Sequence, residues 1–313
     1  MHDRMKKNKD FETFTRPPII QGNPPACSRG TIFMDFVENG PLQYFSYPAV
    51  ITAMENNLIA YINYCSSLPG AQIEVMPRHI TAITGMAQPS LNAIMRIRFT
   101  PQQIKQQIAS AMEPFQARQI PMLWWLFPGT QPLDLGVALI EQGIQYAGAT
   151  PGMAIPLAEL PACPDITYPH TMTVEEVQNE ETLYEWIHTS ALSFEEEDSA
   201  IDPDYIAFER RLGWGQQRPY RRFLARIAGV AIGTAALFTG AGVVGLYSVG
   251  TLPAMRRRGV ASALSIAALQ ATQAQGYQIG VLQASHQGYS MYNRLGFREC
   301  CRIHNYIWTP AHL

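Results

Sequence analysis

Cysteine is scarce in this chain, and no two cysteines stand at C-x-x-C spacing. The 313 residues contain five: Cys27, Cys65, Cys163, Cys300 and Cys301. Thiols so few and so irregularly spaced fit neither a zinc knuckle nor a disulfide-rich scaffold. We therefore expect reduced thiols, a cytoplasmic location and no bound metal.

Charge of one sign is missing from each of two consecutive segments. Twelve acids and no Lys or Arg lie between Thr171 and Glu209, and eleven arginines and no acid lie between Arg210 and Arg298. Ion pairs between the two blocks and solvated helix faces explain part of this pattern. A basic block without counter-charge also suits a polyanionic ligand. Because few aromatic residues lie among the arginines, we expect a phosphorylated small molecule rather than nucleic acid.

Charge of either sign is absent from Ile227 to Met255, which is long enough to span a bilayer. The segment contains six glycines, Gly229, Gly233, Gly240, Gly242, Gly245 and Gly250. Short β-branched runs between glycine-rich turns are typical of buried strands, so we expect strands and no membrane partner. The basic N-terminus is not followed by an apolar stretch, and no secretory signal is expected.

The composition, 47% hydrophobic and 15% charged, is that of a chain that forms a core. Its length favours two domains, and a proline-rich joint at 156–169 divides it into similar halves. We expect a poorly ordered leader at 1–30, a first domain at 31–165 and a second at 166–313.

The hydrophobic pattern predicts an α/β fold with a mixed central sheet flanked by helices. In the second half it predicts helices at 180–192, 204–212, 259–275 and 290–295, and strands at 222–227, 230–238, 243–249, 278–284 and 297–308. The first half repeats the ending of this series, with helices at 101–118 and 133–142 and strands at 122–127 and 144–155. The order of four successive elements favours a degenerate duplication over coincidence.

The most informative segment is 246–264, LYSVGTLPAMRRRGVASAL, where a strand leads through a loop into a helix. Arg256, Gly259 and Ala261 form the pattern R-x-x-G-x-A. Such a loop offers backbone N–H groups and the positive end of a helix dipole, and Gly259 lets a phosphate approach the backbone closely. Arg257 and Arg258 add charge-assisted hydrogen bonds. The segment predicts a diphosphate site.

This loop resembles the acyl-CoA pyrophosphate motif of the GNAT (GCN5-related N-acetyltransferase) superfamily. A second segment, Tyr292-Asn-Arg-Leu-Gly296-Phe297, is similar to the Y-x-x-x-G-F segment of the same family. The resemblance covers about 172–308. The first half looks like the degenerate copy of tandem members, because 99–104 has no glycine or arginine loop and Leu139 stands where Tyr292 does.

The resemblance implies acetyl-CoA as co-substrate and a strand, 246–251, that splays from its neighbour to bind the pantetheine arm. A backbone N–H near Val249 would polarise the thioester carbonyl, and Tyr292 would protonate the leaving thiolate, with Tyr289 as a nearby alternative. The implied cofactor-binding residues are Val249, Gly250, Thr251, Arg256, Arg257, Arg258, Gly259, Val260, Ala261, Ser262 and Ser285. Ser285 equally fits a simple turn, and Val249 a core strand.

The general base and the acceptor are less specified, because no carboxylate lies between Arg210 and Arg298. The acidic run Glu195, Glu196, Glu197 and Asp198 is the expected acceptor-side carboxylate source, with His188, His286 or a water chain as alternatives. The sequence leaves a small amine, an antibiotic, a peptide terminus and a protein lysine open as acceptors. The function expected is acyl-CoA-dependent N-acyl transfer by direct attack in a ternary complex; the alternative is a non-catalytic acyl-CoA sensor.

Overall fold

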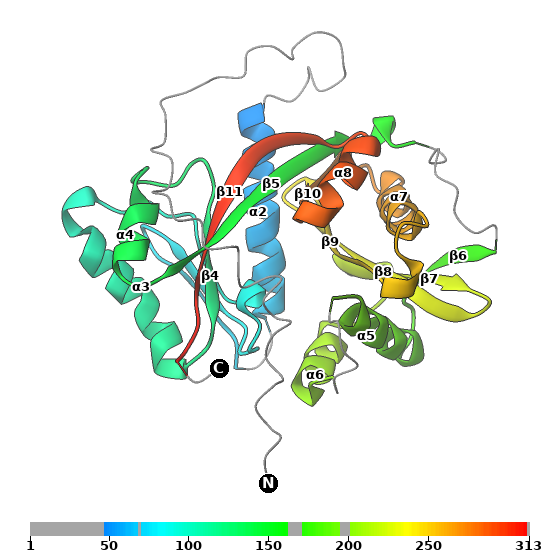
Figure 1. Ribbon diagram of the computed structural model, residues 1–313, viewed down its shortest axis with the longest axis horizontal. Helices are drawn as coiled ribbons and strands as arrows, with labels where there is room; N and C mark the ends of the chain where they lie inside the picture. Colours follow the sequence, from blue (N-terminus) through cyan, green and yellow to red (C-terminus); the bar gives the residue numbers. More distant parts are fainter. Residues whose placement is uncertain (1–46, 68–69, 162–170, 195–200, 312–313) are drawn as a thin grey trace. The chain divides into compact units, whose positions relative to one another are not determined.

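A computed structural model describes residues 47–67, 70–161, 171–194 and 201–311. The expected leader at 1–30 and the acidic run 195–198 lie outside these ranges. The described chain forms two compact units (Figure 1). Unit 1 holds 65–150 and the chain from Arg302; unit 2 holds Tyr47–Tyr64 and Pro151–Cys301. The units differ from the sequential domains expected at 31–165 and 166–313. Tyr47–Tyr64 and 151–156 come from the first half of the chain but belong to unit 2, and the chain from Arg302 comes from the second half but belongs to unit 1.

Unit 2 is an antiparallel sheet with one parallel pair. Its strands follow the order β5-β10-β9-β8-β7-β6, and only β9 and β10 run parallel. The strands are β5 (Gln145–Pro156, of which 151–156 lie in this unit), β6 (Met172–Glu176), β7 (Tyr220–Ile227), β8 (Val230–Gly240), β9 (Val243–Thr251), β10 (Ile279–Gln283) and the start of β11 (Arg298–Trp308). The helices are α2 (Tyr47–Cys65), α5 (Glu180–Phe194), α6 (Pro203–Leu212), α7 (Val260–Gln273) and α8 (His286–Arg294), with short turns η4 (Leu157–Glu159) and η5 (Pro253–Met255).

The uncharged segment 227–255 forms β8 and β9, as predicted. Leu237, Val244 and Leu246 from these strands are buried in one core with Leu264 and Leu269 of α7. Across the described ranges, the structure contains no helix with the length and apolarity that a membrane crossing requires.

Helix α2 packs on β8 and β9 of unit 2 through Asn57, which is fully buried. The Asn57 Nδ2 group donates to the carbonyl oxygens of Phe238, Gly240 and Val243 at 2.9–3.3 Å, and its Oδ1 accepts from the Tyr247 hydroxyl at 2.8 Å. The Tyr61 ring stacks on that of Tyr247, with centroids 4.4 Å apart. A helix from the first quarter of the chain thus completes unit 2.

Unit 1 has its own strands, with helices α3 and α4 between them. Its sheet runs β1-β2-β3-β4-β11, in which only β3 and β4 are parallel. The elements are β1 (Gln72–Val75), β2 (Ile80–Ile83), η2 (Pro89–Leu91), β3 (Ala93–Met95), η3 (Pro101–Gln103), α3 (Ile104–Arg118), β4 (Met122–Leu126), α4 (Leu135–Glu141), the start of β5 and the end of β11. Trp124 and Phe115 lie in its core. The buried side chain of Asn92 bonds Thr84, Met86, Gln88 and Pro121 and fixes the loops around β3.

The sequence predicted most of these elements. The strands at 222–227, 230–238, 243–249, 278–284, 297–308, 122–127 and 144–155 and the helices at 180–192, 204–212, 259–275, 101–118 and 133–142 are confirmed within a few residues. No strand was predicted before the helix at 180–192, and the structure has β6 there. The helix expected at 290–295 begins at His286, because Ser285 caps it.

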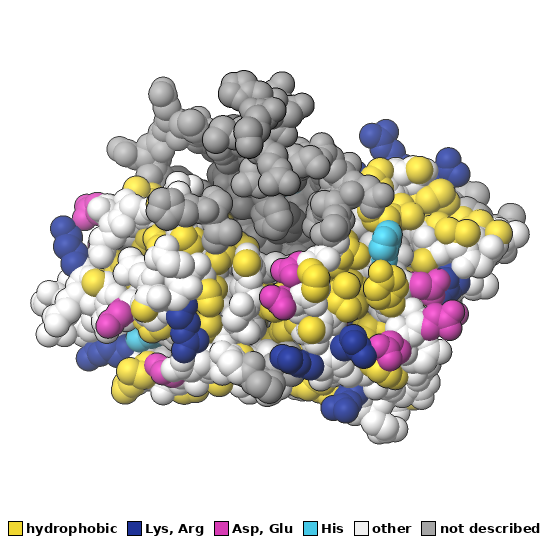
Figure 2. Space-filling view, turned by 90° about the horizontal axis from the view of Figure 1, so that it is seen from below, with side chains coloured by type: hydrophobic (Ala, Val, Ile, Leu, Met, Phe, Trp, Pro, Cys, Tyr) yellow, Lys and Arg dark blue, Asp and Glu magenta, His cyan; other side chains and the backbone are white. Residues whose placement is uncertain are grey.

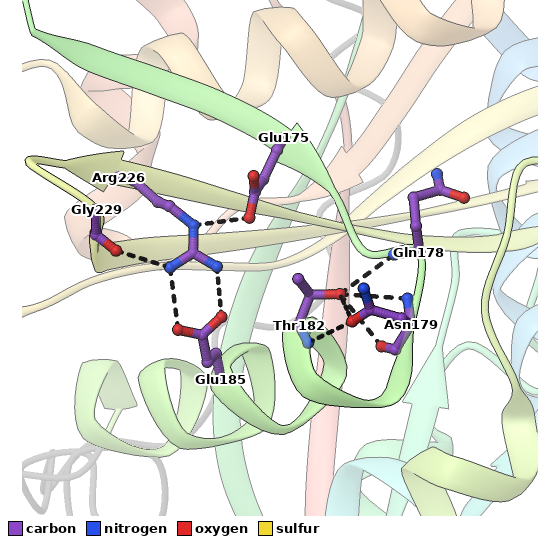
Figure 3. Close-up of polar contacts among 7 residues, drawn as sticks. All are labelled: Glu175, Gln178, Asn179, Thr182, Glu185, Arg226 and Gly229. Carbon is purple, nitrogen blue, oxygen red and sulfur yellow. Dashed lines mark hydrogen bonds and ion pairs between the residues drawn. The ribbon is translucent and has the colours of Figure 1, made fainter.

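Ion pairs within unit 2 account for part of the charge segregation. Arg226 lies between Glu175 of β6 and Glu185 of α5, with its Nε 2.7 Å from Glu175, and also donates to the Gly229 carbonyl (Figure 3). Beside it, Asn179 and Thr182 cap the start of α5. Further pairs are Arg210–Glu180, Arg221–Glu176, Arg222–Glu209 and Arg298–Glu159. On the face drawn in Figure 2, the described basic and acidic side chains are interspersed and form no single basic patch.

Candidate functional site

The loop before α7 exposes the N-terminus of that helix. Gly259 is the N-cap residue with φ 75°, and no side chain caps the helix. The N–H groups of Val260, Ala261 and Ser262 stand in the first turn, where an α-helix provides no acceptor of its own. Arg257 also has positive φ, 62°. The backbone is therefore shaped to present N–H groups and the positive dipole end, as the motif predicted.

Three arginines surround this helix end, and all three are exposed. Arg256 ties the loop to its neighbours, because its Nη2 donates to the Ser193 carbonyl at 3.1 Å and its Nε to the Thr251 carbonyl at 3.4 Å. Within the described ranges, Arg257 and Arg258 make no ion pair. Over the part of the chain that the structure describes, six arginines of the block form no ion pair, and half of them, Arg256, Arg257 and Arg258, stand together at the start of α7.

Strand β9 carries a bulge at Ser248 and Val249. Its register with β8 steps from Thr234–Gly250 to Ala236–Tyr247, so both residues stand opposite Ala235, and Ser248 has φ 47°. The Ala235 carbonyl accepts a hydrogen bond from the Trp186 indole at 3.1 Å. A bulge leaves one residue of the ladder unpaired, and this one falls where the resemblance expects a polarising N–H near Val249.

Strands β9 and β10 pair over a short length only. Their register joins Val244 to Gly280 and Gly245 to Val281, and no pair follows along the rest of the two strands. Strand β9 stays paired with β8 as far as Thr251. The two parallel strands therefore separate from Leu246 onwards, which confirms the expected splay. We call this opening the wedge.

Gly250 and Thr251 end β9 beside α5. A Cβ atom on Gly250 would lie 2.7 Å from Ser193 Cβ, so only glycine fits there. Thr251 is half-buried, and its Oγ1 has no hydrogen-bond partner within the described ranges. Val260 and Ser262 face the core, whereas the Ala261 carbonyl accepts from Ser265 Oγ at 2.8 Å.

Tyr292 is buried, 7% exposed, and packs edge-on against Phe297 with ring centroids 5.5 Å apart. A side-chain hydrogen bond joins its hydroxyl to Ser265. Burial raises the pKa of Tyr292 well above that of a free phenol, and the Ser265 bond offsets part of this. The Ser265 hydroxyl also donates to the Ala261 carbonyl at 2.8 Å, so Ser265 lies between Tyr292 and the first turn of α7. Tyr289, one turn earlier, is only partly buried against the same core.

The remaining predicted site residues do not gather at the start of α7. Ser285 caps α8, with its Oγ accepting from the Gly288 N–H at 3.1 Å. His286 begins α8 and His188 lies on α5 near the Tyr184 ring; both are exposed. Glu195, Glu196, Glu197 and Asp198 lie outside the described residues. In the described ranges, no three His, Cys, Asp or Glu side chains gather where they could hold a metal ion.

Three residues at this site were not predicted from the sequence. Asn57 bonds to Tyr247 of β9, and Ser265 contacts Tyr292. Gln283 is the last residue of β10, beside the wedge. Ser265 is fully buried on α7 among apolar residues, and a polar residue among them is the signal that could have pointed to it. Asn57 gave none, since its partners lie more than 180 residues away.

Comparison with known proteins agrees with this geometry. Residues 181–297 match the sequence model of the Acetyltransferase (GNAT) family. A GCN5-related N-acetyltransferase from Kribbella flavida is 19% identical over 82% of this chain and 97% of that one, with a TM-score of 0.63. A GCN5-related N-acetyltransferase from Sphaerobacter thermophilus is 17% identical over 84% and 93%, with a TM-score of 0.54. A tandem GNAT protein from the clavulanic acid biosynthesis pathway is 13% identical over 84% and 95%, with a TM-score of 0.53.

No curated protein has a matching sequence. At these identities the solved structures show the fold, which is a mixed α/β sheet flanked by helices and GNAT-like. The matched segment shows a GNAT acetyltransferase domain within unit 2. The family expectation is confirmed for this domain.

Proposed function

We propose that unit 2 is an N-acetyltransferase that moves an acetyl group from acetyl-CoA to a primary amine by direct attack in a ternary complex. The observation that carries the proposal is the uncapped N-terminus of α7, flanked by Arg256–Arg258 and adjoining a strand that diverges from its parallel neighbour. We place the reaction in the cytoplasm, in keeping with the thiols of Cys300 and Cys301, which form no disulfide within the described ranges.

The residues present fit the co-substrate. A diphosphate needs N–H donors and cations, and the first turn of α7 with Gly259, Val260, Ala261 and Ser262 provides the donors. Arg257 and Arg258 provide exposed charge, while Arg256 is held in place by two backbone carbonyls. Ser285, at the start of α8, would bond the cofactor through its exposed hydroxyl.

The unpaired edge of β9 is proposed to bind the pantetheine arm. Backbone groups of Val249, Gly250 and Thr251 have no partner from β10, so they can form a ladder with the amide groups of the arm. The bulge aims an N–H at the thioester oxygen, where it stabilises the negative charge that develops as the amine attacks.

Tyr292 is proposed to hold the proton for the leaving group. The amine nitrogen bonds to the acetyl carbon, the carbon–sulfur bond breaks, the thiolate takes the tyrosine proton, and the amine proton passes to a base or to solvent. The raised pKa keeps the hydroxyl protonated at neutral pH. Ser265 orients it through the bond that links it to α7.

The acidic run Glu195, Glu196, Glu197 and Asp198 follows α5 directly, and we propose that it supplies the base or attracts a cationic acceptor. His188 and His286 are the alternatives. Unit 1 is proposed to be a degenerate copy without a cofactor site. Its α3 follows the turn Pro101–Gln103 rather than a glycine loop, and Leu139 is buried where Tyr292 stands in unit 2.

A non-catalytic acyl-CoA sensor is the second candidate, favoured by the lack of any carboxylate on β7–β10. Calorimetric titration with acetyl-CoA and assay of free CoA release over a panel of primary amines separate the two. Binding with turnover supports the enzyme, and binding without turnover of any amine supports the sensor. Absence of binding overturns both.

A further inference from the structure

Ser248 has a backbone conformation that is uncommon for a serine. Its φ is 47°, in the left-handed region, and it stands at the bulge where two residues of β9 face one residue of β8. A residue other than glycine keeps such a conformation only where its surroundings hold it there. The shape of the bulge therefore depends on what Ser248 contacts.

The contact comes from Thr234 of β8. The Thr234 Oγ1 atom donates a hydrogen bond to the Ser248 carbonyl oxygen at 3.2 Å. Thr234 is fully buried and pairs with Gly250, the first residue of β9 after the bulge. A buried hydroxyl needs an acceptor, and the bulge provides one.

This hydrogen bond fixes the direction of the next N–H group. The Ser248 carbonyl and the Val249 N–H belong to one peptide group, which is planar and trans. In such a group the two point in opposite directions, so a carbonyl held by Thr234 directs the Val249 N–H away from Thr234. Strand β9 lies between β8 and β10, and β10 has diverged from Leu246 onwards. The N–H therefore faces the unpaired edge of β9.

The same hydrogen bond makes the Val249 N–H a better donor. A peptide group whose carbonyl accepts a hydrogen bond is polarised, and its N–H then donates more strongly. A donor to an oxyanion must also keep its direction while negative charge develops, because reorientation during the reaction costs part of the stabilisation. Thr234 meets both needs from within the core.

We propose that Thr234 is a positioning residue for acetyl transfer: its hydroxyl holds the Ser248–Val249 peptide group so that the Val249 N–H points at the thioester oxygen of acetyl-CoA. The inference rests on the proposed acetyltransferase function and adds to it a residue of β8 that touches neither substrate. A threonine with a role in packing alone would fill the core and leave kcat unchanged.

The test separates the two groups that threonine carries on its Cβ. Thr234→Val keeps the volume and removes the hydroxyl, whereas Thr234→Ser keeps the hydroxyl and removes the methyl group. Thr272→Val is the matched control, because Thr272 is also fully buried in unit 2 and its Oγ1 donates to the Leu269 carbonyl at 2.7 Å. CoA release by the full chain gives kcat, and calorimetry gives the Kd for acetyl-CoA.

We expect Thr234→Val to lower kcat by about 10- to 100-fold, somewhat less than deletion of an oxyanion donor, and to leave the Kd for acetyl-CoA within about threefold. Thr234→Ser should restore kcat to within about threefold of the wild type, although its missing methyl group leaves a small cavity. Thr272→Val should change neither quantity. A role in packing alone predicts the opposite order, with the valine variant active and the serine variant impaired.

Should Thr234→Val not fold, Thr234→Ala takes its place, since it differs from Thr234→Ser in the hydroxyl alone. The inference is overturned, and the proposed function stands, if removal of the hydroxyl leaves kcat unchanged or if Thr234→Ser loses as much kcat as Thr234→Val. A wild-type protein that releases CoA with no amine contradicts the proposed function itself, and the inference falls with it.

Discussion

The Tyr292 side chain is enclosed by the core of unit 2, and its hydroxyl contacts Ser265. Its ring packs on Phe297 whether or not the hydroxyl is present. Removing the oxygen therefore tests the chemistry with little change in packing.

We predict that Tyr292→Phe lowers kcat for acetyl transfer by about 100-fold or more, the contribution of a general acid, and leaves the Kd for acetyl-CoA unchanged. Steady-state CoA release and calorimetry measure the two quantities. Tyr289→Phe is the control and should retain kcat. Full activity in Tyr292→Phe would remove this residue from the mechanism.

The raised pKa of Tyr292 also sets how stability depends on pH. A phenol that ionises near pH 10 when unfolded and only at higher pH when folded contributes a constant stability below pH 10. We predict that above pH 10 the free energy of unfolding falls by up to about 1.4 kcal/mol per pH unit on account of this residue. Denaturant unfolding between pH 9 and pH 11 measures this dependence. In Tyr292→Phe the free energy of unfolding should fall less steeply with pH.

At the scale of elements, a buried ion pair holds α6 against β7. Arg222 is fully buried, its Nε lies 2.8 Å from Glu209 Oε2, and its guanidinium lies 4.3 Å from the Tyr220 ring centroid. Loss of one partner leaves an uncompensated charge in the core.

We predict that Glu209→Gln lowers the free energy of unfolding by about 3–5 kcal/mol, whereas Glu180→Gln, which breaks the exposed pair with Arg210, changes it by less than about 1 kcal/mol. Urea unfolding of the two variants provides the comparison. If both variants lost the same free energy of unfolding, burial would not make the Arg222–Glu209 pair more important than the exposed pair.

Elements with a clear local pattern were predictable. The apolar runs of β8 and β9 and the alanine-rich α7 are defined by residues within each segment, and the predictions for them are confirmed. Strands β1–β3 and β6 are three to five residues long, too short for a periodic pattern. The bulge at Ser248–Val249 depends on pairing with β8, so no local pattern encodes it.

At the scale of the whole molecule, the sequence cannot show that α2 belongs to unit 2. Asn57 bonds Phe238, Gly240 and Val243, all more than 180 residues away in the chain. The motif around Gly259 was readable because it consists of consecutive residues. The residues that support it come from distant segments, which is why Asn57 and Gln283 escaped prediction.

We predict that Asn57→Ala lowers the free energy of unfolding by about 2–4 kcal/mol, because the carbonyls and the Tyr247 hydroxyl that it serves lose their partner. Thr52→Ala, an exposed change on the same helix, should be nearly neutral. Thermal unfolding of the full chain compares them. A neutral Asn57→Ala would mean that α2 is dispensable to unit 2.

The central claim is that the N-terminus of α7 binds the diphosphate of acetyl-CoA, and calorimetry on one pair of variants tests it. Gly259→Glu and Gly276→Glu introduce the same charge and the same strain at positive φ, 75° and 84°, before and after the same helix. We predict that Gly259→Glu abolishes acetyl-CoA binding while Gly276→Glu binds as the wild type does, both remaining folded by circular dichroism. An unchanged Kd in folded Gly259→Glu would contradict the account.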